Sequence, residues 1–181
     1  MTPCIALLRG INVGRAKRIA MADLRGLVEA LGFSQVRTLL NSGNVLFEAA
    51  RPNAAKVARS IEQAIEARFG FRVAVVVITA ADLDTIIKEN PLSQATADAS
   101  RFLVAFVASP ATLGKAKALL AQAWAPDELA LGSRAAYLSC VNGLIESKLA
   151  QAFARVAADG ATTRNWSTVL KLQALVEKDT V

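Results

Sequence analysis

The order of short apolar strands and amphipathic helices constrains this fold more than any other feature of the sequence. Helices are indicated by apolar residues three and four positions apart, and strands by short apolar runs. The first half predicts, in order, a strand at Cys4–Leu8, a helix from Met21 stopped by Gly32, strands at Val36–Leu40 and Val45–Phe47, a helix between Pro52 and Gly70, and a strand at Arg72–Ile78. This order predicts the split βαβ, or ferredoxin-like, arrangement.

The second half nearly repeats this order. The elements expected there are a strand at Phe102–Val107, a helix entered through Pro110 that carries Leu113, Leu119, Leu120 and Trp124, strands at Glu128–Leu131 and Ala135–Val141, and a helix that carries Leu149, Phe153 and Val156. Where a fourth strand would complete the repeat, the sequence indicates a final helix from about Trp166 to Glu177 instead. We therefore expect an α+β fold of two ferredoxin-like subdomains, the second modified with an extra C-terminal helix.

A short helix and a polar stretch separate the two halves. Thr79-x-x-Asp82 resembles a capping box that opens the helix, and Asn90-Pro91 ends it. The small, polar stretch Ser93–Ser100 follows, and we place the boundary there. The expected organisation is a subdomain at 1–79, a helical connector at 80–100, and a second subdomain at 101–181.

The absence of histidine excludes several classes of function. Without an imidazole, the chain has no Ser-His-Asp or Cys-His machinery and no histidine-bearing zinc site. The two cysteines, Cys4 and Cys140, cannot close a structural zinc site alone. Each lies in an apolar strand pattern, so both are expected to be free and buried. We expect neither a bound metal nor a cofactor.

The hydrophobicity of the chain does not indicate a membrane protein. The longest apolar runs, Phe102–Ala108 and Val73–Ile78, are far shorter than the roughly 20 residues that a spanning helix needs. The segment Met1-Thr2-Pro3-Cys4 has no signal-peptide pattern. These features favour a cytoplasmic protein without membrane contact, and nothing in the sequence indicates an oligomeric state.

The excess positive charge is concentrated near the N-terminus. The net charge is +6. From Asp23 to Asn90 basic and acidic residues cancel. Four basic residues precede Asp23, the first acidic residue: Arg9, Arg15, Lys17 and Arg18. This distribution predicts a local anion site rather than a uniformly basic surface.

Topology brings a second polar segment to the same place. The first two strands of a βαββαβ unit are parallel, because a crossover helix joins them. The loop Arg9–Arg18 and the turn Asn41–Asn44 should therefore leave the sheet at one end, beside a helix N-terminus. A phosphate or carboxylate could bind there to main-chain N–H groups that the glycines leave accessible, to the positive end of the helix dipole and to the arginines. The alternative is simple loop and turn geometry with a solvated basic face.

Known nucleotide-binding motifs do not match this loop. Gly10–Gly14 is one residue too short for a Walker loop, is followed by no Lys-Ser/Thr pair, and is not G-x-G-x-x-G. RNA-recognition domains stack bases on aromatic residues of the sheet. Here the first strand has none and the third has only Phe47.

In the second half, Ser147 and Lys148 are adjacent. Neighbouring positions on a helix point about 100° apart, so the two are poorly placed for a Ser-Lys dyad. Ser147 is expected as a helix N-cap, and Lys148 as a surface or anion-facing amine.

The start of the final helix has two interpretations. In the first, Thr163 or Asn165 caps the helix and Trp166 packs into the core. In the second, Arg164 and Asn165 form a second anion-binding helix terminus. The sequence leaves both open.

Three segments together resemble a known bacterial family. They are Leu8–Gly14 with Met21-x-x-Leu24-Arg25, Val36-Arg37-Thr38 leading to Ser42-Gly43-Asn44-Val45-x-Phe47, and Ser147-Lys148-Leu149 followed by Thr163-Arg164-Asn165-Trp166. The chain is similar, over about Cys4–Leu175, to the family catalogued as domain of unknown function 1697. The resemblance implies two ferredoxin-like subdomains and brings no established reaction or cofactor. The chain departs from the usual family pattern at Arg15–Ala20 and at Leu39–Asn41.

Three functional hypotheses remain. The first is a module that binds an anionic ligand: a nucleotide, a phosphorylated metabolite or a nucleic-acid backbone. The second is an enzyme acting on a phosphorylated or carboxylated substrate with Lys148 or a carboxylate as acid–base group, and the third is a structural or protein-interaction module. The ligand-binding residues predicted for the first are Arg9, Gly10, Asn12, Gly14, Ser42, Gly43, Asn44, Lys148, Arg164 and Asn165.

Overall fold

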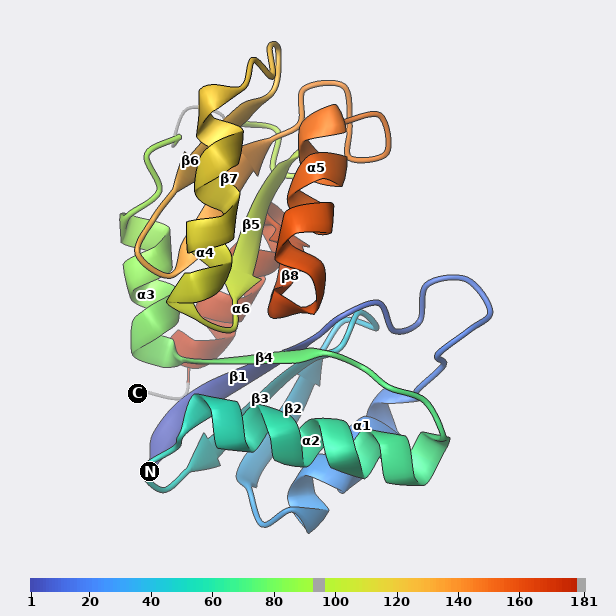
Figure 1. The fold of residues 1–181 in the computed structure, drawn as a ribbon. Helices are drawn as coiled ribbons and strands as arrows, with labels where there is room; N and C mark the ends of the chain where they lie inside the picture. Colours follow the sequence, from blue (N-terminus) through green and yellow to red (C-terminus); the bar gives the residue numbers. More distant parts are fainter. Residues whose placement is uncertain (93–96, 179–181) are drawn as a thin grey trace. The chain divides into compact units, whose positions relative to one another are not determined.

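Each half of the chain is built on a four-stranded antiparallel sheet (Figure 1). The computed structural model describes residues 1–92 and 97–178. Contacts divide the chain into Met1–Ala81, here unit 1, and Asp82–Val181, here unit 2. The elements of unit 1 are β1 (Thr2–Leu8), α1 (Met21–Ala30), β2 (Ser34–Leu39), β3 (Asn44–Ala49), α2 (Ala54–Phe69) and β4 (Val75–Thr79).

The sheet of unit 1 has the strand order β2-β3-β1-β4. β3 is antiparallel to both β1 and β2, so β1 and β2 run in the same direction. This is the ferredoxin-like arrangement that the element order predicts. The C-terminal end of β1 and the turn after β2 therefore lie at the same end of the sheet.

Helices α1 and α2 cover one face of this sheet (Figure 1). Alternate residues of β1 point to that face because side chains alternate along a strand. They pack with apolar residues of the two helices: Cys4, Ala6 and Leu8 with Leu24, Leu27 and Val28 of α1 and Val57, Ile61 and Ile65 of α2. Gly32, with φ +89°, and Gly70, with φ +76°, end the two helices as predicted.

Unit 2 repeats this topology. Helix α3 (Ala80–Lys88) spans the boundary between the units. The elements that follow are β5 (Phe102–Val107), α4 (Pro110–Ala116), the 3₁₀ helix η2 (Lys117–Ala121), β6 (Glu128–Leu131), β7 (Ala135–Ser139), α5 (Lys148–Ala157), the 3₁₀ turn η3 (Ala158–Gly160), β8 (Ala161–Asn165) and α6 (Trp166–Glu177). The strand order β6-β7-β5-β8 is that of unit 1.

The fourth strand of unit 2 corrects the sequence prediction. No strand was expected before the final helix, yet β8 pairs antiparallel with β5 along its whole length. Its sequence is mostly polar, which hides the pattern of a strand. The polar side chains are accommodated by local bonds, since Arg164 Nη1 donates to Thr162 Oγ1 at 3.0 Å. Ala161 alone supplies the apolar contact with the helix-side core.

The first helix of unit 2 is shorter than predicted. α4 ends at Ala116 and continues as η2 to Ala121, so Trp124 lies beyond the helix. The indole Nε1 of Trp124 donates to the main-chain oxygen of Leu119 at 2.7 Å, which anchors the ring to the end of η2.

Helix α3 is bound to the β6–β7 hairpin of unit 2. The Tyr137 hydroxyl donates to the Ile86 oxygen at 2.6 Å, and the Ser133 hydroxyl donates to the Glu89 carboxylate at 2.8 Å. Arg134 also forms an ion pair with Asp82, with Nε 3.2 Å from Oδ1. These contacts group α3 with the second unit.

Three further sequence expectations concern composition and boundaries. Cys4 and Cys140 are both free and buried, as predicted. Part of the polar stretch Ser93–Ser100, where the boundary was expected, lies outside the described residues. No helix in the described part of the chain is long and apolar enough to cross a membrane.

Candidate functional site

Asn12 organises the loop after β1. Its Nδ2 donates to the Ile19 oxygen at 2.9 Å, and its Oδ1 accepts from the Ile19 N–H at 2.9 Å. Its own N–H donates to the Lys17 oxygen at 3.0 Å. Asn12 has φ +56°, a left-handed conformation that asparagine tolerates better than most residues. One residue therefore closes the loop upon itself.

The same amide joins the loop to the turn between β2 and β3. Asn12 Nδ2 also donates to the Asn41 oxygen at 2.8 Å. The Leu8 N–H donates to the Gly43 oxygen at 2.8 Å. The two polar segments that topology predicts at one end of the sheet thus meet there.

Gly43 occupies a position where no side chain fits. Its φ is +78°, and a Cβ built there would lie 2.7 Å from Leu8 Cβ and 2.8 Å from Ile11 Cδ1. Ile11 and Leu8 are buried in the core, so they cannot move away easily. Gly43 is required for the close approach of turn and loop.

Asn44 and Ser42 stabilise the turn. Asn44 is fully buried, and its Nδ2 donates to the Leu39 oxygen at 2.8 Å and to Ser42 Oγ at 3.0 Å. A buried amide costs free energy unless it is hydrogen-bonded, and these bonds offset that cost. The described contacts of Asn12, Gly43 and Asn44 therefore support the shape of the site.

The basic side chains lie on the exposed part of this scaffold. Arg15, Lys17 and Arg18 are exposed, and Arg18 Nη1 donates to the Gly14 oxygen at 3.1 Å. Arg9 is half-buried. Gly10 and Gly14 both have φ +67° and open space where a side chain would stand. Main-chain groups at these glycines can be approached closely from solvent.

Comparison of the two units shows that the loop is not required by the fold. In both units, the residue after the first strand donates to the residue next to the last strand: Arg9 N to Ala74 O, and Ala108 N to Gly160 O, at 2.9 and 2.8 Å. The connection to the following helix is Arg9–Ala20 in unit 1 but only Ala108–Ser109 in unit 2. The longer loop is an addition to a shared framework.

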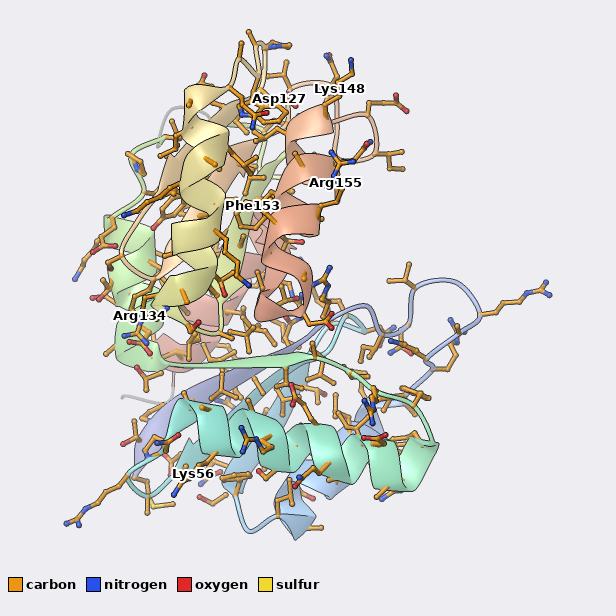
Figure 2. All side chains as sticks on the ribbon, viewed as in Figure 1. Lys56, Asp127, Arg134, Lys148, Phe153 and Arg155 are labelled. Atoms are coloured by element: carbon orange, nitrogen blue, oxygen red, sulfur yellow. The ribbon has the colours of Figure 1, made fainter. Side chains whose placement is uncertain are left out.

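In unit 2, Ser147 is the N-cap of α5, as predicted. Its Oγ accepts from the Ala150 N–H at 3.0 Å and donates to Asp127 Oδ2 at 2.7 Å. Asp127 Oδ1 in turn accepts from the Val141 N–H at 2.9 Å. Asp127 was missed in the sequence, where a carboxylate after a proline indicates only a turn. Lys148, the first residue of α5, is exposed near Asp127 (Figure 2).

Arg164 is buried in β8, with 8% of its surface exposed. Its Nη1 donates to Thr162 Oγ1 and to the Thr163 oxygen. Burial lowers the pKa of Arg164 to about 10, so the guanidinium stays charged at neutral pH. These hydrogen bonds hold a charged guanidinium group inside unit 2.

Asn165 caps the final helix, in agreement with the first of the two interpretations. Its Oδ1 accepts from the Thr168 N–H at 3.0 Å and from the Thr168 hydroxyl at 2.8 Å. Trp166 packs edge-on against Phe102, with ring centroids 5.6 Å apart. The oxygen of Asn165 is thus engaged in helix capping.

The sheet of unit 2 separates two of the predicted site residues. Ala161 packs with α5 on one face of the sheet. Arg164 is three residues further along β8, and because side chains alternate along a strand, it points to the opposite face. Arg164 therefore lies on the face away from Lys148. Within residues 1–92 and 97–178, no group of three or more cysteine, aspartate or glutamate side chains could hold a metal ion.

One comparison with known proteins identifies the family of the chain, and another supports its fold. The family model "Protein of unknown function (DUF1697)" matches residues 1–137. The structure of the conserved bacterial protein SP0830 from Streptococcus pneumoniae is similar, with a TM-score of 0.73 and 21% sequence identity over 96% of this chain and 97% of that chain. At this identity the similarity concerns the fold. No curated protein matches the chain significantly.

Proposed function

The chain belongs to the DUF1697 family, whose function is unknown, and we propose that it binds a small anionic ligand at the loop Arg9–Arg18. The ligand class is a phosphate- or carboxylate-bearing compound such as a nucleotide or a phosphorylated metabolite. The proposal concerns binding and assigns no reaction.

The loop itself carries the proposal. It is longer than the equivalent connection in unit 2, contains four basic residues and no acidic one, and is fixed by the amide of Asn12. An ordered loop loses less conformational entropy when it binds than a disordered one. Like charges held close together repel unless an anion lies between them. This combination supports an anion as the ligand.

The predicted site residues and three further basic residues of the loop take different parts in this proposal. Arg15, Lys17 and Arg18 contact the anion through charge-assisted hydrogen bonds. Gly10 and Gly14 allow main-chain N–H groups to approach it. The residues that hold this shape are Asn12, Ser42, Gly43 and Asn44. Arg9 adds charge at the base of the loop.

Unit 2 gives less support to an enzyme. Lys148 is exposed, so it lacks the desolvated surroundings that favour an acid–base lysine. Arg164 and Asn165 have described contacts that stabilise β8 and α6. Binding at the loop of unit 1 therefore accounts for the geometry with fewer assumptions than catalysis.

A thermal-shift assay of the full chain with ATP, glucose 6-phosphate and citrate tests the proposal. A ligand at about 100 times its Kd adds roughly 2.7 kcal/mol to the free energy of unfolding. For a chain of this size, the expected rise in Tm is about 5–10 °C. The absence of a shift with all three probes at low salt would contradict anion binding.

A double variant locates the site. Arg15→Gln with Lys17→Gln removes two exposed charges from the loop and should abolish most of the ligand-induced shift. Lys56→Gln with Arg59→Gln removes the same two types of charge from the exposed side of α2 and should leave the shift unchanged. Equal loss in both variants would indicate a general charge effect and overturn the assignment to the loop.

A further inference from the structure

The helices that cover one face of the sheet of unit 2, α4, η2 and α5, carry only positive charge. α4, η2 and α5 contain no aspartate or glutamate. Their charged residues are Lys115, Lys117, Lys148 and Arg155. Unit 2 as a whole is neutral, with ten basic and ten acidic residues, so this face does not simply reflect an excess of charge in the unit.

The equivalent helices of unit 1 provide an internal comparison. α1 and α2 contain four basic and four acidic residues. Some of these pair, as Arg68 does with Asp23 at 3.0 Å. The same fold thus tolerates a balanced helical layer. The exclusively basic layer of unit 2 is a property of its sequence that the topology does not require.

All four basic side chains are available to a partner. Each is exposed, and none of them forms an ion pair within residues 1–92 and 97–178. Lys148 and Arg155 are seven residues apart on α5, which places them on one side of the helix about 10 Å apart along its axis. Figure 2 shows both projecting outward, while Phe153 points between α5 and α4.

The surface between these charges carries few large side chains. The exposed residues among them are mostly small: Ala111, Gly114, Ala118, Ala121 and Ala154. α4 and α5 lie side by side and contact each other (Figure 1). A small phosphate compound needs several donors that converge on one point, whereas these charges are spread over α4, η2 and α5. Such an arrangement suits an extended polyanion.

The composition of this face distinguishes among polyanions. No aromatic residue of α4, η2 or α5 is exposed, because Phe153 is buried, so bases of a single strand have no stacking platform. Leu120 is the one large apolar residue exposed on these elements, and Leu144 and Ile145 are exposed in the loop before α5. Protein interfaces and membrane-binding helices use larger apolar areas.

We propose that the outer face of α4, η2 and α5 binds the phosphate backbone of duplex nucleic acid without reading its sequence. Acidic residues lie at the margins of this face. Glu146 and Asp159 lie beyond the two ends of α5, and the carboxylate of Asp127 accepts hydrogen bonds from Ser147 and Val141. The proposal goes beyond the small-anion site, because it concerns another unit and another class of partner.

Fluorescence anisotropy of the full chain with a labelled DNA duplex tests this inference. Four phosphate contacts predict that log K falls with log salt concentration with a slope of about −3.6 between about 50 and 200 mM salt. Lys148→Gln with Arg155→Gln should reduce the magnitude of the slope by about half and weaken binding at low salt by at least about tenfold. Both residues are exposed, and unchanged circular dichroism would verify the fold.

Two controls separate this inference from the proposed function. Lys56→Gln with Arg59→Gln removes the same charges from α2, the equivalent helix of unit 1, and should leave duplex binding nearly unchanged. Arg15→Gln with Lys17→Gln should abolish most of the small-anion shift while the charges of α4, η2 and α5 still bind the duplex. Equal duplex affinity of wild type and the Lys148/Arg155 variant would overturn the inference. Binding to phosphatidylserine vesicles or polyglutamate without binding to the duplex would also overturn it.

Discussion

The side-chain amide of Asn12 donates a hydrogen bond to the main-chain oxygen of Asn41 at 2.8 Å, which fixes the loop after β1 against the turn between β2 and β3. The same nitrogen donates to the oxygen of Ile19. Both bonds end on main-chain oxygens, so they depend on Asn12 and not on the identity of its partners. The side chain of Asn12 therefore helps to fix the position of the basic loop.

Replacing Asn12 by aspartate should lower the free energy of unfolding by about 2 kcal/mol. Aspartate tolerates the left-handed conformation, so the change removes the two donated bonds without adding backbone strain. It also places a carboxylate against two carbonyl oxygens. Urea denaturation measures the change.

Asn41→Ala is the matched control for this variant. The described bond uses only the main-chain oxygen of Asn41, so the substitution should change stability by less than about 0.5 kcal/mol. A similar loss in both variants would mean that the bond from Asn12 is not what stabilises the loop.

Gly43→Ala should destabilise the protein more than Gly10→Ala. Both glycines have positive φ, which costs a residue with a Cβ about 1–2 kcal/mol. At Gly43 the added Cβ also meets Leu8 Cβ at 2.7 Å, whereas nothing lies within 4 Å at Gly10. We expect a loss of about 2–4 kcal/mol at Gly43 and about 1 kcal/mol at Gly10. Equal Tm values for the two variants would contradict the predicted steric clash.

The elements that could be predicted from the sequence are those with apolar periodicity. The helix stops at Gly32 and Gly70 and the cap at Ser147 follow from local chemistry, and the structure confirms them. β8 was missed because it is paired through its main chain and its polar side chains bond locally. Apolar periodicity predicts strands that bury apolar side chains, and it does not identify a polar strand such as β8.

The candidate site was predicted less completely than the fold. Topology placed Arg9–Arg18 beside Asn41–Asn44, since that follows from strand direction. Which residues shape the loop and the turn, and which basic side chains remain exposed, depends on hydrogen bonds that sequence spacing does not specify. The separation of Lys148 from Arg164 by the sheet depends on which side chains of β8 point to each face. The sequence analysis did not predict β8, so it could not assign Arg164 to a face.

Ser147→Ala should lower the free energy of unfolding by about 1–2 kcal/mol, because it removes the cap of α5 and the donor to Asp127. Ser109 occupies the corresponding N-cap position of α4 but makes no capping bond with its side chain. Ser109→Ala should therefore be nearly neutral, within about 0.5 kcal/mol. Chemical denaturation of both variants checks the difference, and a neutral Ser147→Ala would refute the capping role.

Tyr137 should resist ionisation until the protein unfolds. It is the only tyrosine in the chain and is fully buried, and its hydroxyl donates to the Ile86 oxygen. Burial, with a smaller contribution from the charge of Glu89, raises the pKa of Tyr137 above its usual value. Because the unfolded chain loses this proton above about pH 10 and the folded one does not, the stabilising contribution is complete below that pH and decreases as the pH rises.

Near-ultraviolet absorbance of the phenolate and fluorescence of the two tryptophans, recorded along one alkaline titration, distinguish ionisation from unfolding. We expect both signals to change together, at a pH above that of free tyrosine. Glu89→Gln should lower this midpoint only slightly, because burial is the larger cause of the raised pKa. Phenolate formation near pH 10 with unchanged fluorescence would show that Tyr137 reaches solvent in the folded protein and that α3 is not held against the β6–β7 hairpin as described.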